Sequence, residues 1–294
     1  NCELIRRLSR ALRQAKKLAK DPDFILWNSS KIREVMEKKF GDLSIDEEFK
    51  RRCPCGKKCS VLTAIKVDAA NYFKAVDRRR GAINAATMLA RITHRSGNDA
   101  IALSRHKSQT SFYCKKSRPS TPTFTTIPFI HITNNIEYTM RDQHFTLGRY
   151  ILERQRGWAM GHALSEPITT IDLAHYERKL HVSKAFRKSV GLEWKDWSLP
   201  QLFTGIRHVD DLLVASKLLC SSCLQKAVKN IYPRDCGFSL EDEGEEFRFL
   251  HVLLHVNADG SFNLSPFSAN EGFAQGLERT PKTARLAKFH RNFH

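Results

Sequence analysis

The chain has 294 residues, of which 49 are Lys or Arg and 31 are Asp or Glu, so its formal net charge is +18. With 41% hydrophobic and 27% charged residues, its composition excludes a wholly disordered, collagen-like or disulfide-scaffold protein. The positive charge favours a polyanionic partner, either nucleic acid or an anionic membrane surface. No apolar run approaches the roughly 20 residues of a membrane-spanning helix, so we expect no membrane span.

The first predicted element in chain order is a basic amphipathic helix over Glu3–Lys20. Leucine and alanine recur at helical spacing on one face, and Arg or Lys occupy the other faces. The helix is predicted to end at Asp21-Pro22. Its basic surface could either remain solvated or contact phosphates, and the sequence leaves both open. A second helix is predicted over Ser30–Phe40.

Three cysteines follow within a short segment, at Cys53, Cys55 and Cys59. Three thiolates at this spacing, completed by Cys114 or a histidine, would form a tetrahedral zinc site. The alternative is a cysteine-rich turn introduced by Pro and Gly. Eight cysteines in the whole chain are too few for a secreted scaffold, so we expect a reducing compartment. We expect the location to be intracellular and nuclear. We also expect the chain, which begins at Asn1, to be a fragment of a longer protein.

The rest of the chain alternates between strand and helix patterns, which indicates a mixed α/β fold. A short buried strand over Ala64–Asp68 ends in an acid, and a helix is predicted over Asn71–Ile92. Ser104–Pro128 contains three prolines and is predicted to be a loop or insertion. Near the end, Phe247–Val256 alternates as a strand and Asn257–Gly260 supplies a turn.

A second acidic position lies far downstream, in Ile206–Val214. Apolar residues flank the pair Asp210-Asp211, as expected of a hairpin with the acids at its tip. Adjacent carboxylates between apolar strands are unfavourable unless something neutralises them, and a divalent cation is the simplest candidate. Magnesium prefers such oxygen ligands.

Three segments resemble the catalytic motifs of reverse transcriptases, and they occur in the order of that family. They are Asp68–Asp77, in which the acid is followed after four residues by an aromatic, then Gly157–Pro167, then Arg207–Ser216. Gly237–Glu241 and Phe249–Leu254 resemble the motifs that follow. Phe145–Gly157, together with Met160-Gly161, is most similar to the Penelope-like retroelement enzymes, which are relatives of telomerase. The resemblance covers roughly residues 62–266.

The resemblance implies an α+β fold with a right-hand polymerase palm, which is a mostly antiparallel sheet backed by helices, with reduced fingers and a short or truncated thumb. It divides the chain into a basic helical region and remnant of fingers (1–60), a palm (61–266) with a fingers insertion around 93–150, and a basic tail or start of a thumb (267–294). The implied activity is that of a retroelement RNA-directed DNA polymerase. Its implied partners are an RNA template, a DNA primer and dNTP.

The resemblance also implies the site residues. Asp68 and Asp210 would bridge two Mg²⁺ or Mn²⁺ ions, with Asp211 assisting. The substrate-binding residues would be Tyr72, Phe73, Gln155, Gly161 and Ser165. Phe73 would be an aromatic wall that excludes a ribose 2′-hydroxyl, although it could equally be a core residue. Ser165 could contact the substrate or cap a helix.

The sequence departs from the family pattern at His208, where Tyr is usual, and at His162, where Ser is usual. The region before Asp68 also lacks a recognisable set of basic residues for the triphosphate. These departures suit a degenerate or domesticated palm that binds nucleic acid without chemistry. That alternative does not explain why all three motif acids remain.

A different enzyme class is suggested by His175-Tyr-Glu177 and Cys220-Ser-Ser-Cys223, which imitate the ligand pattern of a zinc-dependent nucleobase deaminase. The Pro that normally precedes the first cysteine is missing. Cys220 and Cys223 also fall within a helical pattern, where core thiols on one helix face account for the pair.

Overall fold

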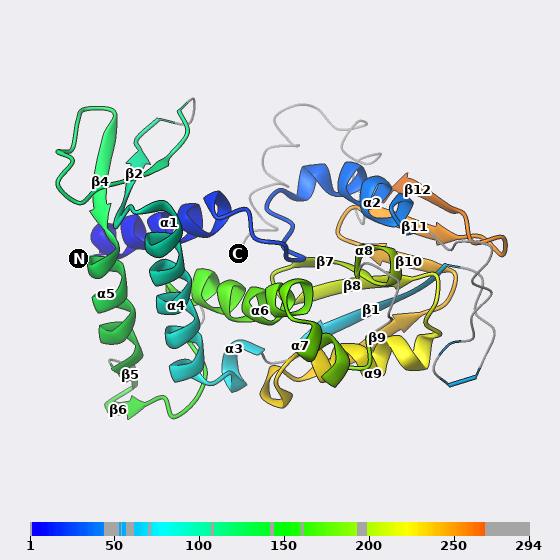
Figure 1. Ribbon diagram of the computed structural model, residues 1–294. Coiled ribbons are helices and arrows are strands. Elements are labelled where there is room, and N and C mark those ends of the chain that lie inside the picture. The colour runs from blue at the N-terminus through cyan, green and yellow to red at the C-terminus, as the bar shows by residue number, and fades with distance from the viewer. Residues whose placement is uncertain are drawn as a thin grey trace, which may run out of the picture.

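The computed structural model describes residues 2–43, 53, 55–56, 62–69, 72–106, 109–141, 144–159, 162–192 and 199–267. Its central element is a four-stranded sheet in the order β7-β8-β1-β9, in which all neighbouring strands are antiparallel. The strands are β1 (Thr63–Ala69), β7 (Thr204–His208), β8 (Asp211–Ser216) and β9 (Phe238–Glu243). The sheet is drawn across the centre and right of Figure 1.

Both faces of this sheet are buried. Leu212 and Val214 of β8 belong to a core that includes the helices α6 (Ser165–Val182) and α9 (Ser221–Ile231). Leu213 and Ala215 belong to a second core with α2 (Ile32–Gly41) and a three-stranded sheet, whereas η1 (Ser29–Lys31), directly before α2, has no buried residue. That sheet contains β10 (Glu246–Phe249), β11 (Val252–Val256) and β12 (Phe262–Pro266). Burial on two faces explains the continuous apolar run of β8.

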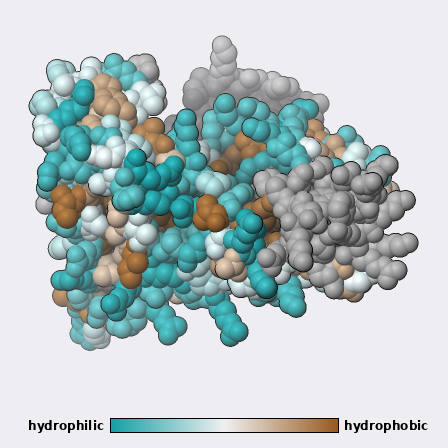
Figure 2. All heavy atoms as spheres, viewed as in Figure 1, coloured by the Kyte–Doolittle hydropathy of each residue, from teal (hydrophilic) through white to brown (hydrophobic). Residues whose placement is uncertain are grey.

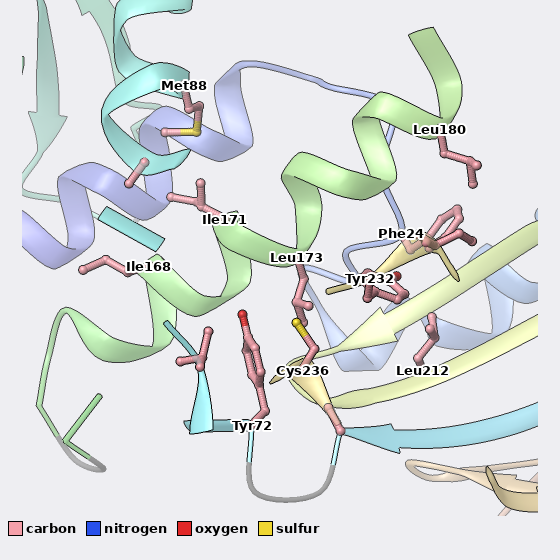
Figure 3. Close-up of a cluster of buried hydrophobic side chains, with 14 of the residues drawn as sticks. Phe24, Tyr72, Met88, Ile168, Ile171, Leu173, Leu180, Leu212, Tyr232 and Cys236 are labelled. Carbon is pink, nitrogen blue, oxygen red and sulfur yellow. The ribbon is translucent and has the colours of Figure 1, made fainter. Parts of the chain in front are cut away.

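Helix α6 runs through the larger core (Figure 3). On one side of α6, its own Ile168 and Ile171 point toward Met88 of the neighbouring helix. On the other side, Leu173 of α6 points toward the sheet, where Tyr232 also lies. Eleven residues of α6 are buried, and eight of them, Pro167–Ala174, are consecutive and so cover every face of that part of the helix. This burial fixes the N-terminal half of α6, whose first residues belong to the second motif. Short elements complete this region: α3 (Tyr72–Ala75), α7 (Lys184–Ser189), α8 (Leu199–Leu202) and η3 (Arg234–Cys236).

The second part of the molecule, on the left of Figure 1, is built by α1 (Cys2–Leu18), α4 (Arg78–Ser96) and α5 (Phe129–Arg141) with two small sheets. One sheet has the order β3-β2-β4, from β2 (Ala100–Ser104), β3 (Phe112–Cys114) and β4 (Phe124–Pro128). The other is the hairpin of β5 (His144–Leu147) and β6 (Tyr150–Glu153). Most of the residues predicted to be a fingers insertion, 93–150, lie here.

The predicted helix over Glu3–Lys20 is confirmed as α1, and the apolar side chains of Leu8, Leu12 and Ala15 are buried. Its basic surface is not uniformly solvated, because Lys16 is 3% exposed. The Lys16 ammonium lies 3.1 Å from Asp21 and 2.5 Å from Asp23. Helix α1 is therefore tied to the molecule by ion pairs as well as by its apolar face.

Three sequence expectations were wrong in detail. The single helix expected over Asn71–Ile92 is two helices, because Asp77 accepts hydrogen bonds from the first backbone N–H groups of α4 and starts that helix anew. The segment expected to be a loop or insertion, Ser104–Pro128, is not a loop, because it contains β3 and β4, which pair with β2. The strand expected over Phe247–Val256 is two strands, separated by a turn in which Leu250 has φ of 56°.

The expected α+β class, with antiparallel sheets backed by helices, is confirmed. The segment predicted to be a tail or thumb, 267–294, lies outside the described residues from position 268 onward. None of the helices in the described ranges combines the length and apolar character needed to cross a bilayer. Hydrophilic residues cover most of the visible described surface, and hydrophobic residues form small scattered patches (Figure 2).

Candidate active site

The predicted acidic hairpin is present. Strands β7 and β8 pair with His208 opposite Asp211, which leaves Val209 and Asp210 as a two-residue turn. Val209 has φ of 59°. Tight hairpin turns of this length need positive φ at the first central residue, where glycine or asparagine is usual. A β-branched residue is strained in this conformation, and such strain persists only where the surroundings fix it.

The side chain of Arg207 holds the hairpin turn by a hydrogen bond to its backbone. Its fully buried guanidinium donates to the Val209 carbonyl at 2.8 Å and to the Glu177 carboxylate of α6 at 2.5 Å. Glu177, also fully buried, accepts from the Phe24 N–H at 2.9 Å and from the Tyr232 hydroxyl at 3.1 Å. The strained turn is therefore attached to a fully bonded buried ion pair, and neither Arg207 nor Glu177 was assigned this role from the sequence.

The first-motif acid lies beside the hairpin. Asp68 is the Cα partner of Asp211 across the β1–β8 pair, and the Ala69 N–H donates to the Asp210 carbonyl at 3.4 Å. Asp68 and Asp211 are both half-buried. The structure thus brings the three predicted catalytic acids, which come from segments far apart in the sequence, to the same end of two neighbouring strands.

The acids repel one another. Burial and the carboxylates of Asp210 and Glu241 raise the pKa of Asp68, against an opposing effect of Lys66. Burial also raises the pKa of Asp211, opposed by Lys66 and reinforced by Asp210. Lys66 is paired with Glu241 at 2.7 Å, so this one cation is shared among several carboxylates. Accumulated negative charge on oxygen donors is the chemistry that a divalent cation such as Mg²⁺ would relieve.

Tyr72 lies in the core, where its side chain is 2% exposed. Its hydroxyl donates to Asp172 at 3.1 Å and to the Thr169 carbonyl at 3.0 Å, both on α6. Asp172 also accepts from Arg80 at 2.8 Å and from Asn84 at 2.6 Å. This network holds α3 and α4 against α6. The contacts give Tyr72 a positioning role, and substrate binding by Tyr72 stays a prediction.

Phe73 is half-buried and lies 5.9 Å from the Tyr72 ring, measured between ring centroids. Its carbonyl accepts the Trp158 N–H at 2.7 Å. Gly157 makes this contact feasible, because a Cβ at position 157 would lie 2.2 Å from the Phe73 oxygen and the residue has φ of 70°. The first and second motifs are therefore joined backbone to backbone. Gly161, the predicted nucleotide contact, lies outside the described residues.

Gln155 is exposed and lines a cavity of about 540 Å³. The cavity opens at the N-terminus of α4, and Arg78, Arg79 and Arg156 are among its lining residues. Asp77 and Asp235 also line this cavity, so its lining is mixed in charge with an excess of arginine. Ser165 is buried, and its hydroxyl donates to the Ala159 carbonyl at 2.7 Å. Ser165 thus joins the start of α6 to Ala159, and it makes no described side-chain cap.

The cysteines assemble differently from the sequence expectation. Cys53 and Cys55 lie next to Cys220 and Cys223, and the four sulfur atoms are within 4.8 Å of one another. Among the described residues, these cysteines are the one set of three or more potential metal ligands that lie so close together. The sequence expectation of Cys114 as a further ligand was wrong, because Cys114 belongs to β3 and is not in this set. Cys59 lies outside the described residues.

The ligand set of a deaminase is not assembled. His175 is absent from the cysteine cluster, and Glu177, which would transfer protons in such an enzyme, is fully buried against Arg207. Cys220 and Cys223 keep their cysteine spacing but have two other cysteines as neighbours. The Cys220–Cys223 half of the deaminase pattern therefore belongs to the cysteine cluster, and Glu177 of the other half belongs to the buried ion pair with Arg207.

No protein-family model and no curated protein sequence matches the chain. Among solved structures, apo telomerase from Candida tropicalis aligns with a TM-score of 0.57 at 13% identity, over 90% of this chain and 40% of the telomerase chain. Telomerase from Candida albicans, in complex with a TWJ fragment of telomeric RNA, aligns with a TM-score of 0.51 at 14% identity, over 93% and 42%. The chain thus spans about two fifths of these two telomerase chains, and it has a polymerase-like fold in common with telomerase.

Proposed function

We propose that the chain is an RNA-directed DNA polymerase of a retroelement, and that it transfers a nucleotide from dNTP to a primer 3′-hydroxyl. The observation that carries the proposal is the placement of Asp68 beside the Asp210-Asp211 hairpin, at the end of adjacent strands. Support for a nucleic-acid substrate comes from the +18 net charge and from the telomerase-like fold, which in one solved structure accompanies an RNA fragment.

The reaction forms a bond between the primer 3′-oxygen and the α-phosphorus of dNTP, and it breaks the bond to pyrophosphate. Two Mg²⁺ ions, when bound, would activate the hydroxyl and stabilise the charge on the leaving group. Asp68 and Asp210 would hold these ions, with Asp211 assisting. Arg207 would act through the hairpin, because it holds the Val209 carbonyl and hence the direction of Asp210.

A primer-extension assay tests the proposal. The full chain should extend a DNA primer annealed to an RNA template when dNTP and Mg²⁺ are present, and extension should stop when EDTA is added. A chain that binds the primer–template with normal affinity yet never extends it, with Mg²⁺ or Mn²⁺, would instead be the non-catalytic palm that His208 and His162 suggest.

Sugar selection gives a second prediction under the same proposal. Replacing Phe73 with valine should open space for a 2′-hydroxyl and raise the ratio of ribonucleotide to deoxynucleotide incorporation by roughly ten- to a hundredfold, the effect of about 1 to 3 kcal/mol. The ratio of kcat/KM values for the two substrates is the measurement. If Phe73 only fills the core, the variant should melt at lower temperature and extend poorly with both nucleotides at an unchanged ratio.

A further inference from the structure

Four cysteine side chains from two distant segments converge beside the central sheet. Cys53 and Cys55 precede β1, whereas Cys220 and Cys223 lie at the start of α9. Their sulfur atoms all lie within 4.8 Å of one another. In Figure 1 the described part of the first segment is the short blue trace beside α9. This four-cysteine cluster is made by the tertiary structure, because 167 positions separate Cys53 from Cys220.

The spacing of the sulfurs fits a single tetrahedral ion. Zinc–sulfur bonds are about 2.3 Å long, so two sulfurs on a tetrahedral zinc lie about 3.8 Å apart. The Cys220 sulfur lies 3.7 Å from that of Cys53 and 3.6 Å from that of Cys55. A disulfide would hold its two sulfurs at about 2.05 Å. Both distances match sulfurs on one tetrahedral ion, and neither matches a disulfide.

We propose that the four-cysteine cluster binds one zinc ion through all four thiolates. Four protein ligands fill a tetrahedral shell and leave no position for water or substrate, so the site is structural and not catalytic. Thiolate ligands also select zinc over magnesium, which keeps this site distinct in chemistry from the carboxylates of the hairpin. The inference does not depend on the proposed polymerase function.

The local backbone is arranged to hold thiolates. Cys220 is the N-cap residue of α9 and Cys223 lies in its first turn, where the positive end of the helix favours negative sulfur. The Cys220 N–H points at the Cys53 sulfur at 3.4 Å. Gly56 has φ of 84°, and its N–H donates to the Cys53 carbonyl at 2.7 Å, which closes a turn around the first two ligands.

Zinc binding would change the charge of the cluster. A thiol that coordinates zinc loses its proton. Four thiolates around one Zn²⁺ leave a net charge of −2. In the sequence, basic residues flank the first two ligands at Arg51-Arg52 and Lys57-Lys58.

The site has a defined place relative to the acids. In the β1–β8 pair, Thr63 is opposite Ser216 at one end and Asp68 is opposite Asp211 at the other. Cys220 follows closely after Ser216, so the cluster lies toward the end remote from the carboxylates. Zinc would fasten α9 and the segment before β1 to that end of the sheet. Its loss should lower stability without removing a ligand from the hairpin.

Metal content of the purified full chain is the direct test. Purified under reducing conditions without chelator, the wild-type chain should contain about one zinc per chain by plasma mass spectrometry. The variants Cys55→Ser and Cys223→Ser should lose most of this zinc, whereas Cys114→Ser should keep it. Cobalt(II) exchanged into the wild-type chain should give the charge-transfer and d–d bands of a tetrahedral sulfur site.

Several results would overturn the proposal. The proposal would be wrong if the wild-type chain contained no zinc and took up none on titration. It would also be wrong if the chain contained stoichiometric iron in place of zinc. Zinc that depends on Cys59 but not on Cys220 would assign the metal to the local cysteine segment alone. Where the serine variants fail to fold, alkylation of the wild-type chain decides: the four thiols should be protected until a chelator is added, and disulfides among them would contradict the site.

Discussion

Replacing Asp210 with asparagine is expected to lower the rate of magnesium-dependent primer extension by about a thousandfold or more. The amide keeps the shape of the turn but supplies no negative charge to a cation, and metal stabilisation of the transition state is worth several kcal/mol, with each ~1.4 kcal/mol equal to a factor of ten. The measurement is the extension rate at saturating dNTP, with primer–template affinity measured in parallel and expected to stay unchanged.

The same substitution should not destabilise the fold. Repulsion from Asp210 contributes to the raised pKa values of Asp68 and Asp211, so their ionised forms disfavour the folded state once the pH passes their unfolded-state pKa. Removing the Asp210 charge relieves this repulsion, and the melting temperature at pH 7 should stay the same or rise.

Asp259→Asn, in the exposed turn between β11 and β12, is the matched control and should retain full activity. If the Asp210→Asn variant extended primers at the wild-type rate, Asp210 would be excluded as a metal ligand.

The largest stability effect is expected at Glu177. Glu177→Gln leaves the buried Arg207 guanidinium without its counter-charge, and breaking a buried pair from one side typically costs about 3 to 5 kcal/mol. A loss of this size should lower the melting temperature by on the order of 10 °C in a chain of this length. Thermal unfolding followed by circular dichroism is the measurement. The exposed pair of Arg7 and Glu3 provides the control, since Glu3→Gln should change stability by less than about 1 kcal/mol.

A double variant separates the ion pair from simple packing. Glu177→Leu combined with Arg207→Met removes both buried charges, so it should be more stable than Glu177→Gln alone. The double variant should still extend primers poorly, because the Val209 carbonyl has lost the guanidinium that holds the hairpin turn. If the double variant were as active as the wild type, the Arg207 contact would have no part in positioning Asp210.

Much of the palm could be predicted because its signals are local. The β8 run is apolar on both sides of the pleat, and the acid pair lies at the tip of a hairpin, so the strand, its two buried faces and the turn all follow from adjacent residues. The approach of Asp68 to Asp210 was implied only by the resemblance of their motifs to one family, and the pairing of β1 with β8 was not predicted. Strand patterns alone do not specify which distant strands become neighbours.

The missed features are those that need partners from elsewhere. Glu177 and Arg207 look like ordinary helix and strand charges until the fold buries them against each other. Cys220 and Cys223 resemble helix core thiols until Cys53 and Cys55 are brought beside them. Tyr72 was assigned to the substrate by the resemblance, and its hydrogen bond to Asp172 is a contact that the sequence did not indicate. Short-range patterns contain no information about such encounters.

The strand order has a consequence for how the chain acquires its structure during synthesis. β1 is central in the sheet, yet both of its partners, β8 and β9, are encoded roughly 150 or more residues later. At about 5 to 20 residues per second, a ribosome needs roughly 8 to 30 seconds to supply them. Throughout that interval an apolar strand has exposed edges, while α4, β2–β4 and α5 can already pack locally. The lobe on the left of Figure 1 should therefore mature first, and the acids should meet only late in translation.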